Sequence, residues 1–232
     1  MRPFETLASA RTPDGRELTL HRRGGDYFIQ LEGDELMSTR RAASERLLGE
    51  VACRELAGAG APRVLVGGLG LGFTLRAVLD GLPGGRVVVA EVFPEMVAWA
   101  REHLGSVHGT SLEDPRTEVV VRDVWELLAP GAMWDAVLLD VDNGPDAWCL
   151  ERNARLYSGH GLDRIARSLA ASGVLAIWSA RPAPPFEKRL RGAGYEVERR
   201  VAHAHAGKGP RHVVMVATRS RERGRRPDRV GL

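Results

Sequence analysis

From residue 63 onward, short apolar runs alternate with amphipathic segments, and this alternation limits the possible folds more than any other feature of the sequence. The apolar runs occupy residues 63–68, 86–92, 117–124, 134–141 and 173–180. The segments between them have helical periodicity, and the one at 94–104 opens with proline, as helices often do. Apolar strands that alternate with amphipathic helices predict an α/β fold with a mostly parallel sheet covered on both faces.

The chain then continues into two further strand-like segments, residues 195–202 and 211–219. The connection at 203–210 is too short for a crossover helix, so we expect these two strands to pair antiparallel. A mostly parallel sheet with a C-terminal antiparallel hairpin resembles the Rossmann-like sheet of class I methyltransferases and related S-adenosylmethionine-type transferases. It resembles the sheet of a dehydrogenase less well.

Three zones are expected along the chain. Residues 1–38 predict a small N-terminal β segment, with a hairpin around the turn at 24–26, and a helix follows at 39–57. Residues 39–218 predict a nucleoside-binding α/β transferase domain. Residues 219–232 carry six arginines against two acidic residues and predict a basic, disordered tail.

Composition excludes several classes of protein. The net charge of +3 comes from the tail, which contributes +4, and nucleic-acid-binding domains usually carry their basic residues on a folded face. The sequence contains neither an apolar run of about 20 residues nor a secretory signal, so no membrane association is expected. Cys53 and Cys149 form no CxxC pair, which argues against a disulfide scaffold and favours a cytoplasmic location.

A glycine cluster follows the first apolar run of the α/β region. Gly68, Gly70 and Gly72 have the spacing GxGxG, and Phe73 stands where the dinucleotide fingerprint requires its third glycine. Ligands of α/β sheets bind beyond the carboxyl ends of strands, where glycine allows close approach of the backbone. We interpret the cluster as part of a sulfonium-nucleoside site rather than a site for NAD.

Two carboxylates end the next two predicted strands. Glu91, followed by Val92, is placed to accept hydrogen bonds from both ribose hydroxyls of a nucleoside. Asp123, followed by Val124, borders the same crevice and either accepts a hydrogen bond from an adenine amino group or caps the next helix. With the glycine cluster, these four residues complete the predicted nucleoside site.

Asp140 ends the fourth apolar run and is the predicted catalytic residue, also within reach of the nucleoside. A carboxylate here can take the proton of an amine that attacks a sulfonium carbon, and burial would raise its pKa toward working pH. Asp142 and Asn143 follow within a turn-rich loop. They either contact the substrate or only build the turn before the next glycine and proline.

No metal site is predicted. His203, His205 and His212 lie near the last turn, but no further ligands have a suitable spacing, so we interpret all three as surface residues.

These motifs resemble those of the spermidine/spermine synthase family, the aminopropyltransferases, over roughly residues 27–180. The likeness rests on the glycine loop, the strand ending at Glu91, the segment from Asp114 to Asp123, and the strand ending at Asp140. The resemblance implies transfer of an aminopropyl group from decarboxylated S-adenosylmethionine to a polyamine-like amine, with Asp140 as catalytic aspartate. It also implies a possible homodimer.

The chain departs from the family at several positions. Leu71 stands where the family has an aspartate that holds the donor's amine, a charge-assisted hydrogen bond worth about 1.5–3 kcal/mol when buried. Of the family's aromatic pair near the acceptor, Tyr157 remains. Trp178 ends another strand and either borders the substrate or belongs to the core. Ser44 and Glu45 lie near an acidic position of the family and are candidates to face the pocket.

Two alternatives to aminopropyl transfer remain open. The same nucleoside half could serve a methyltransferase that uses S-adenosylmethionine itself, and Leu71 agrees with a donor that carries a carboxylate. A non-catalytic relative that only binds a nucleoside is the other alternative. The nature of the nucleoside product separates the two enzymatic interpretations.

Overall fold

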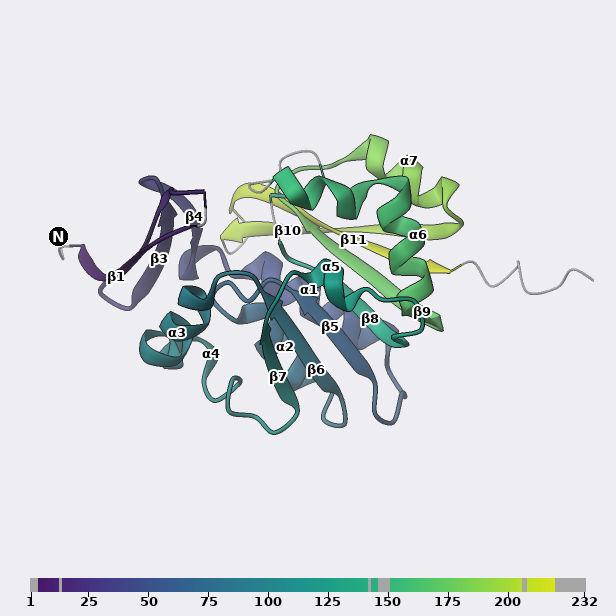
Figure 1. Ribbon diagram of the computed structural model, residues 1–232, viewed down its shortest axis with the longest axis horizontal. Helices are drawn as coiled ribbons and strands as arrows, with labels where there is room; N and C mark the ends of the chain where they lie inside the picture. The colour runs from purple at the N-terminus through teal and green to yellow at the C-terminus, as the bar shows by residue number, and fades with distance from the viewer. Residues whose placement is uncertain (1–3, 13, 142, 146–150, 206–207, 220–232) are drawn as a thin grey trace, which may run out of the picture.

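A computed structural model describes the chain at residues 4–12, 14–141, 143–145, 151–205 and 208–219. The first structural unit is a four-stranded antiparallel sheet in the order β1-β2-β3-β4. Its strands are β1 (Glu5–Arg11), β2 (Glu17–Arg23), β3 (Asp26–Leu31) and β4 (Asp34–Ser38). Figure 1 shows this sheet in purple beside the larger sheet.

The N-terminal sheet is larger than the hairpin expected from the sequence. The predicted hairpin is confirmed as the β2–β3 pair, which turns at Gly24. The second strand of the expected hairpin is broken in two, because Glu32 and Gly33 both have positive φ angles, of 53° and 84°. Two consecutive residues of this kind make the tight turn typical of hairpins, so β4 folds back onto β3.

The larger sheet has seven strands in the order β10-β11-β9-β8-β5-β6-β7. Its strands are β5 (Arg63–Gly67), β6 (Arg86–Glu91), β7 (Thr117–Val121), β8 (Trp134–Leu139), β9 (Leu169–Ser179), β10 (Tyr195–His205) and β11 (Lys208–Arg219). The five strands from β5 to β9 are parallel, and β11 pairs antiparallel with both β9 and β10. The predicted mostly parallel sheet and its C-terminal antiparallel hairpin are therefore confirmed.

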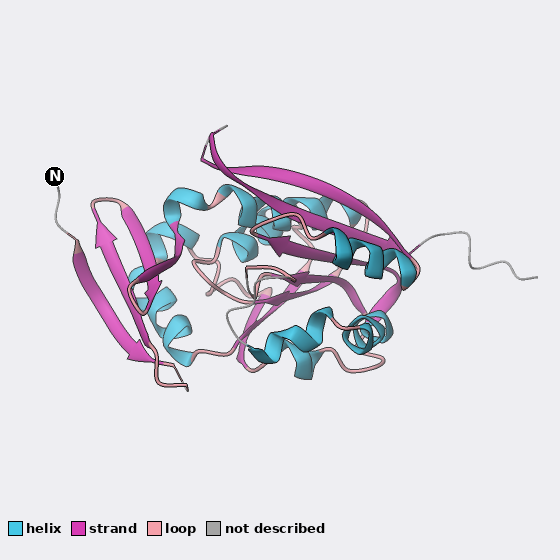
Figure 2. Cartoon of the chain, turned by 90° about the horizontal axis from the view of Figure 1, so that it is seen from above, coloured by secondary structure: helices cyan, strands magenta, loops and turns pink. Residues whose placement is uncertain are grey.

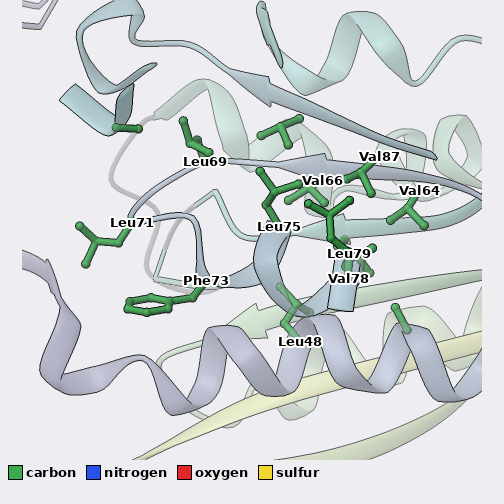
Figure 3. Close-up of a cluster of buried hydrophobic side chains, with 14 of the residues drawn as sticks. Leu48, Val64, Val66, Leu69, Leu71, Phe73, Leu75, Val78, Leu79 and Val87 are labelled. Atoms are coloured by element: carbon green, nitrogen blue, oxygen red, sulfur yellow. The ribbon is translucent and has the colours of Figure 1, made fainter. Parts of the chain in front are cut away.

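Helices cover both faces of this sheet (Figure 2). The helices are α1 (Ala43–Glu55), α2 (Phe73–Gly81), α3 (Pro94–His103), α4 (Gly105–His108), α5 (Val124–Leu127), α6 (Gly159–Ser168) and α7 (Pro184–Gly192), with short 3-10 helices η1 (Thr39–Arg41) and η2 (Glu151–Tyr157). Alternate strand residues point to opposite faces. Val64 and Val66 pack in the cluster that contains α1 and α2 (Figure 3), whereas Leu65 packs in the cluster that contains α6 and α7.

One helix boundary differs from the sequence prediction. The sequence of residues 161–172 predicts a helix over the whole segment, but the helix ends at Ser168, whose hydroxyl donates to the carbonyl of Ile165, and Leu169 is already extended. Leu169 pairs with Trp134, and a register shift then precedes Val174. The last four residues of the expected helix are therefore strand.

The topology brings the carboxyl ends of β5, β6 and β8 to one edge of the larger sheet, next to the N-terminal sheet (Figure 1). This is the edge at which ligands of doubly wound sheets bind. Among the described residues, no helix combines the length and apolar character needed to cross a membrane. The predicted basic tail lies outside the described residues apart from Arg219.

Candidate functional site

Two neighbouring cavities lie at this edge of the larger sheet. The smaller, of about 90 Å³, is here named the glycine-loop cavity, and the predicted residues that line it are Gly68, Gly70, Glu91, Val92, Asp123, Val124 and Asp140. The larger, of about 240 Å³, is named the interface cavity because residues of both sheets line it. Leu18, Leu36, Met37, Phe93, Asp140 and Val141 border both cavities. Asp140 is thus the titratable residue common to the two linings.

The glycine loop is held close to the end of β8. Gly68 has a φ of +93°, and a Cβ atom there would lie 2.2 Å from the backbone oxygen of Asp140. Hydrogen bonds from Gly68 N to Ala90 O and from Asp140 N to Gly67 O, both 2.8 Å, fix the loop to the strands on either side. Position 68 therefore requires glycine for both its conformation and its surroundings.

Glu91 is buried at the end of β6, and backbone amides surround its carboxylate. Leu69 N donates to Oε2 at 3.0 Å, while Val92 N and Phe93 N donate to Oε1 at 2.7 and 3.0 Å. Burial raises the pKa of Glu91, and these amide donors oppose the shift. The carboxylate is oriented by the glycine loop and the turn before α3, at the wall of the glycine-loop cavity.

Asp123 performs the capping role weighed in the sequence and also borders the glycine-loop cavity. Its Oδ1 accepts from Trp125 N at 2.9 Å, which caps α5. Its Oδ2 accepts from Arg155 Nη2 at 2.7 Å. Asp123 therefore caps α5 and also lines the glycine-loop cavity. Its capping role is compatible with a contact to adenine.

Asp140 is held by a threonine from α2. The hydroxyl of Thr74 lies 2.8 Å from Asp140 Oδ2 and 3.1 Å from the backbone oxygen of Glu45, so it connects the end of β8 to α1. Burial raises the pKa of Asp140 to about 6, although the hydrogen bond from Thr74 lowers it. A carboxyl with such a pKa can both accept and release a proton near neutral pH.

Glu45 also contributes a carboxyl group to the interface cavity, which Glu35 and Asp140 line too. Burial, and then the negative charge of Asp140, raises the pKa of Glu45 to about 7. Ser44 Oγ donates to Glu45 Oε2 at 3.0 Å and lies 2.9 Å from Nδ1 of His212. A hydrogen-bonded series therefore runs from Glu45 through Ser44 to the imidazole.

His212 corrects the interpretation of the histidines as surface residues. It lies on β11, lines the interface cavity, and packs edge-on against Trp178 with ring centroids 5.0 Å apart. Burial, and then the positive charge of Arg41, lowers the pKa of His212. The side chains of His203 and His205 lie outside the described residues.

The other residues predicted to contact the substrate do not all lie at the interface cavity. Asn143 and Trp178 line the interface cavity, whereas Asp142 lies outside the described residues. Tyr157 is not brought to either cavity: it is buried and packs edge-on against Phe186, with ring centroids 5.5 Å apart.

Two predicted cofactor contacts are also placed elsewhere. Leu71 does not line either cavity, because its side chain is buried with Leu69 in the hydrophobic cluster of Figure 3. Gly72 precedes α2 with a φ of +85°, and a Cβ atom there would lie 2.9 Å from that of His108. Close packing against α4 accounts for this glycine.

Several lining residues were not among the site residues predicted from the sequence. The connection before β2, strand β4 and η1 contribute Arg16, Glu35 and Arg41, respectively, to the interface cavity. Nothing in their local sequence indicates this, because it follows from how the two sheets pack. Glu45 had one signal in the sequence, its nearness to an acidic position of the family.

Relatives of known name match the sequence, although no protein-family model does. A polyamine aminopropyltransferase of a Synechococcus strain is 37% identical over 130 residues, which cover 54% of this chain and 39% of that protein. One of Mycobacterium tuberculosis is 32% identical over 192 residues, covering 78% of this chain and 35% of that protein. The chain thus spans well under half the length of these curated relatives.

Solved structures agree in fold. Spermidine synthase from Thermotoga maritima superposes with a TM-score of 0.72 over 93% of this chain and 73% of that one, at 16% identity. A spermidine synthase in complex with the transition-state analogue AdoDATO gives a TM-score of 0.71, covering 93% of this chain and 72% of that one, also at 16% identity. The sequence matches thus show that the chain is similar to polyamine aminopropyltransferases over as much as 78% of its length, and the solved structures show that it has the fold of spermidine synthases.

Proposed function

We propose that the chain is a transferase that moves an aminopropyl group from decarboxylated S-adenosylmethionine to an amine acceptor by direct displacement. The observation that carries the proposal is the position of Asp140, a residue that lines both cavities. A donor nucleoside in the glycine-loop cavity and an amine in the interface cavity would meet at this residue. The names of the relatives, polyamine aminopropyltransferases, support the same reaction.

In this proposal the nucleoside contacts come from the glycine-loop cavity. Glu91 accepts hydrogen bonds from the ribose hydroxyls, and Asp123 accepts one from the adenine amino group. Gly68 and Gly70 let the backbone approach the donor, and Val92 and Val124 form part of the apolar wall of the cavity. The support is that all six residues line one cavity.

The proposed reaction joins the acceptor nitrogen to the donor carbon bound to the sulfonium. The nitrogen lone pair forms the new C–N bond as the C–S bond breaks, and the bonding electrons neutralise the sulfur of the departing methylthioadenosine. The proton released from the attacking amine passes to Asp140, whose pKa of about 6 suits a general base near neutral pH. Juxtaposition of the two substrates supplies much of the acceleration.

The acceptor side of the proposal comprises Asn143 and Trp178, which line the interface cavity, together with Asp142 as a residue predicted from sequence. The acceptor is a polyamine-like amine, by analogy with the named relatives. The cytoplasmic location and the possible homodimer expected from the sequence belong to the same proposal.

Mass spectrometry of the nucleoside product tests the proposal. The protein is incubated with decarboxylated S-adenosylmethionine and a panel of amines, and in parallel with S-adenosylmethionine and the same panel. Acceptor-dependent release of methylthioadenosine in the first reaction is the expected result. Release of S-adenosylhomocysteine in the second, with no product in the first, would establish a methyltransferase instead.

A further inference from the structure

Ser44 connects two ionisable side chains of the interface cavity from a fully buried position. It lies in the first turn of α1 and is 0% exposed, whereas Glu45 and His212 both line the cavity. Ser44 Oγ lies 3.0 Å from Glu45 Oε2 and 2.9 Å from Nδ1 of His212, which is 168 residues further along the chain. Buried hydroxyl groups require such partners, and the packing of α1 against β11 supplies the second one.

The direction of these two hydrogen bonds follows from the ionisation of Glu45. An ionised carboxylate can only accept, so the hydroxyl of Ser44 gives its one proton to Glu45. The oxygen of Ser44 then has only lone pairs for His212, so Nδ1 of the imidazole has to carry a proton. While Glu45 is ionised, the neutral ring is therefore the Nδ1–H tautomer.

The surroundings of His212 favour a neutral ring. Burial, and then the positive charge of Arg41, lowers the pKa of His212 from its ordinary value of 6.5. A neutral imidazole can donate to Ser44 without adding a positive charge to the wall of the interface cavity. This matters for a cavity that is proposed to receive a cationic amine, because like charges repel.

The hydrogen bond from Ser44 opposes the effect of burial on Glu45. Burial and the charge of Asp140 raise the pKa of Glu45 to about 7, whereas the hydrogen bond from Ser44 and the charge of Arg46 lower it. Because Ser44 accepts from His212 while it donates to Glu45, the two hydrogen bonds strengthen one another. The other charged side chains of the cavity lining are Arg16, Glu35 and Arg41.

An ionised Glu45 adds a second negative charge to that of Asp140. The two carboxyl groups line the same cavity, and the charge of one acts on the pKa of the other. An alkyl amine is protonated at neutral pH, so it enters as an ammonium ion and is attracted by both carboxylates. After it binds, Asp140 can accept the proton that the attacking nitrogen loses, as in the proposed reaction.

We propose that Ser44 and His212 are positioning residues of the acceptor site. The imidazole Nδ1–H donates to Ser44, and the Ser44 hydroxyl donates to Glu45, which keeps this carboxylate ionised at the wall of the interface cavity to bind the ammonium group of the acceptor. The role in acceptor binding rests on the proposed function, whereas the hydrogen-bonded arrangement does not.

Nuclear magnetic resonance tests the arrangement without any substrate. At about pH 8.5, long-range ¹⁵N–¹H spectra should show His212 as the Nδ1–H tautomer, and the signal is assigned by its absence in His212→Asn. In Ser44→Ala the donor loses its acceptor, so the proton should move to Nε2, and the Glu45 carboxyl should titrate at a higher pH. An Nε2–H tautomer in the wild-type protein, or no change in Ser44→Ala, would overturn the proposal.

Ser168→Ala is the matched control for Ser44→Ala. Ser168 is also a fully buried serine of a helix, its hydroxyl donates to Ile165 O at 2.8 Å, and it lines neither cavity. Neither the tautomer of His212 nor the titration of Glu45 should change in this variant. A change as large as that in Ser44→Ala would show that loss of any buried serine has the same effect.

Kinetics test the role in acceptor binding, with decarboxylated S-adenosylmethionine and 1,4-diaminobutane as substrates. We expect the KM of the diamine to be about tenfold higher in Ser44→Ala than in Ser168→Ala, with the KM of the donor unchanged. Equal values of the KM of the diamine in the two variants would remove Ser44 from the acceptor site.

Two substitutions of His212 isolate its donor. The amide nitrogen of asparagine is bonded to Cγ, as Nδ1 of histidine is, so His212→Asn can still donate to Ser44, whereas His212→Leu cannot. Both variants lose the ring contact with Trp178. The KM of the diamine should therefore be about tenfold higher in His212→Leu than in His212→Asn, and equal values would contradict the role of the imidazole.

Binding measurements separate this inference from the proposed function. If methylthioadenosine is not released, the proposed reaction is wrong, and calorimetry of 1,4-diaminobutane binding in the presence of methylthioadenosine replaces the KM. Binding that is about tenfold weaker in Ser44→Ala than in Ser168→Ala sustains the inference. Equal binding by these two variants, or no binding by the wild-type protein, overturns it.

Discussion

The glycine-loop cavity and the interface cavity meet at Asp140, yet they are built from different kinds of atoms. In the first, backbone amides of Leu69, Val92 and Phe93 hold the carboxylate of Glu91, and glycines form part of the lining. In the second, charged and aromatic side chains supply the polar lining. Backbone recognition constrains local conformation, whereas side-chain recognition can be altered by one substitution.

The largest effect is expected at Gly68, where the two cavities depend on the same backbone. In Gly68→Ala the new Cβ would lie 2.2 Å from Asp140 O at a φ of +93°, so the loop must move. We expect a loss of about 3 kcal/mol in the free energy of unfolding, measured by urea denaturation, and no binding of methylthioadenosine by calorimetry.

Gly58→Ala provides the matched control, because Gly58 has a φ of +89° but nothing lies within 4 Å of its added Cβ. Only the conformational cost of about 1 kcal/mol should remain there, with nucleoside binding intact. Equal losses in the free energy of unfolding of the two variants would show that the close approach of position 68 to Asp140 contributes nothing to the cost of the substitution.

Replacement of Asp140 by asparagine should separate chemistry from nucleoside binding. Asp140→Asn keeps the shape of the side chain but removes the base, so kcat should fall about 10²–10⁴-fold. The affinity for methylthioadenosine should change little, because Glu91 and Asp123 remain. Asp135→Asn, at the other end of β8, is the control. A variant that retains a wild-type kcat would remove Asp140 from the mechanism.

Replacement of Glu45 should shift the pH dependence of the reaction. Asp140 and Glu45, with pKa values of about 6 and 7, titrate as a pair, and the base must be deprotonated to act. Wild-type kcat/KM should therefore rise with pH between about 5.5 and 7.5. Glu45→Gln removes one negative charge, so the rise should move to lower pH, whereas Glu50→Gln on the exposed face of α1 should not move it.

Stability gives a second check on Glu45. Its folded pKa of about 7 exceeds the ordinary value of 4.5, so the folded protein retains a proton that the unfolded chain releases. Stability from this group is complete below about pH 4.5, is lost as pH rises to about 7, and is constant above. Relative to Glu45→Gln, the wild-type protein should lose about 3 kcal/mol across this range. A parallel pH dependence of the two proteins would contradict the raised pKa.

The smallest effect is expected at Trp178, on the acceptor side. Trp178→Phe weakens an edge-on contact with His212 at 5.0 Å, a type of interaction worth about 0.5–1.5 kcal/mol. The KM of the acceptor should rise about 2- to 10-fold, with the KM of the donor unchanged. Trp99→Phe, in the core and outside both linings, should change neither KM. A larger change in the KM of the donor than in the KM of the acceptor would show that Trp178 belongs to the donor site and not to the acceptor site.

The sequence predicts the larger sheet and the glycine-loop cavity well, for a physical reason. Apolar strands such as 63–67 and 134–139 are buried on both faces and therefore differ sharply from amphipathic helices. Residues that end parallel strands, such as Glu91 and Asp140, then come to one edge of the sheet by topology alone. The cavity that contains both can be inferred without knowing any side-chain contact.

The interface cavity could not be predicted in the same way. Arg16 and Arg41 line the interface cavity only because the N-terminal sheet packs against the larger sheet. No sequence pattern near either residue predicts that packing. Tyr157 is the reverse case: the family resemblance placed it near the acceptor, whereas its ring packs against Phe186 and lines neither cavity. His212 was likewise assigned to the surface because it lies near the last turn, at the start of a predicted strand.

The packing of the N-terminal sheet also has an evolutionary consequence. Arg16, Glu35, Arg41 and Glu45 all come from one continuous stretch of chain, residues 12–45, whereas the backbone that orients Glu91 lies entirely outside it. These charged lining residues can therefore be inherited or exchanged as a single block of sequence, separately from Asn143 and Trp178. Because Leu18, Leu36 and Met37 of the same block also line the glycine-loop cavity, a recombination that replaced it would change the walls of both cavities at once.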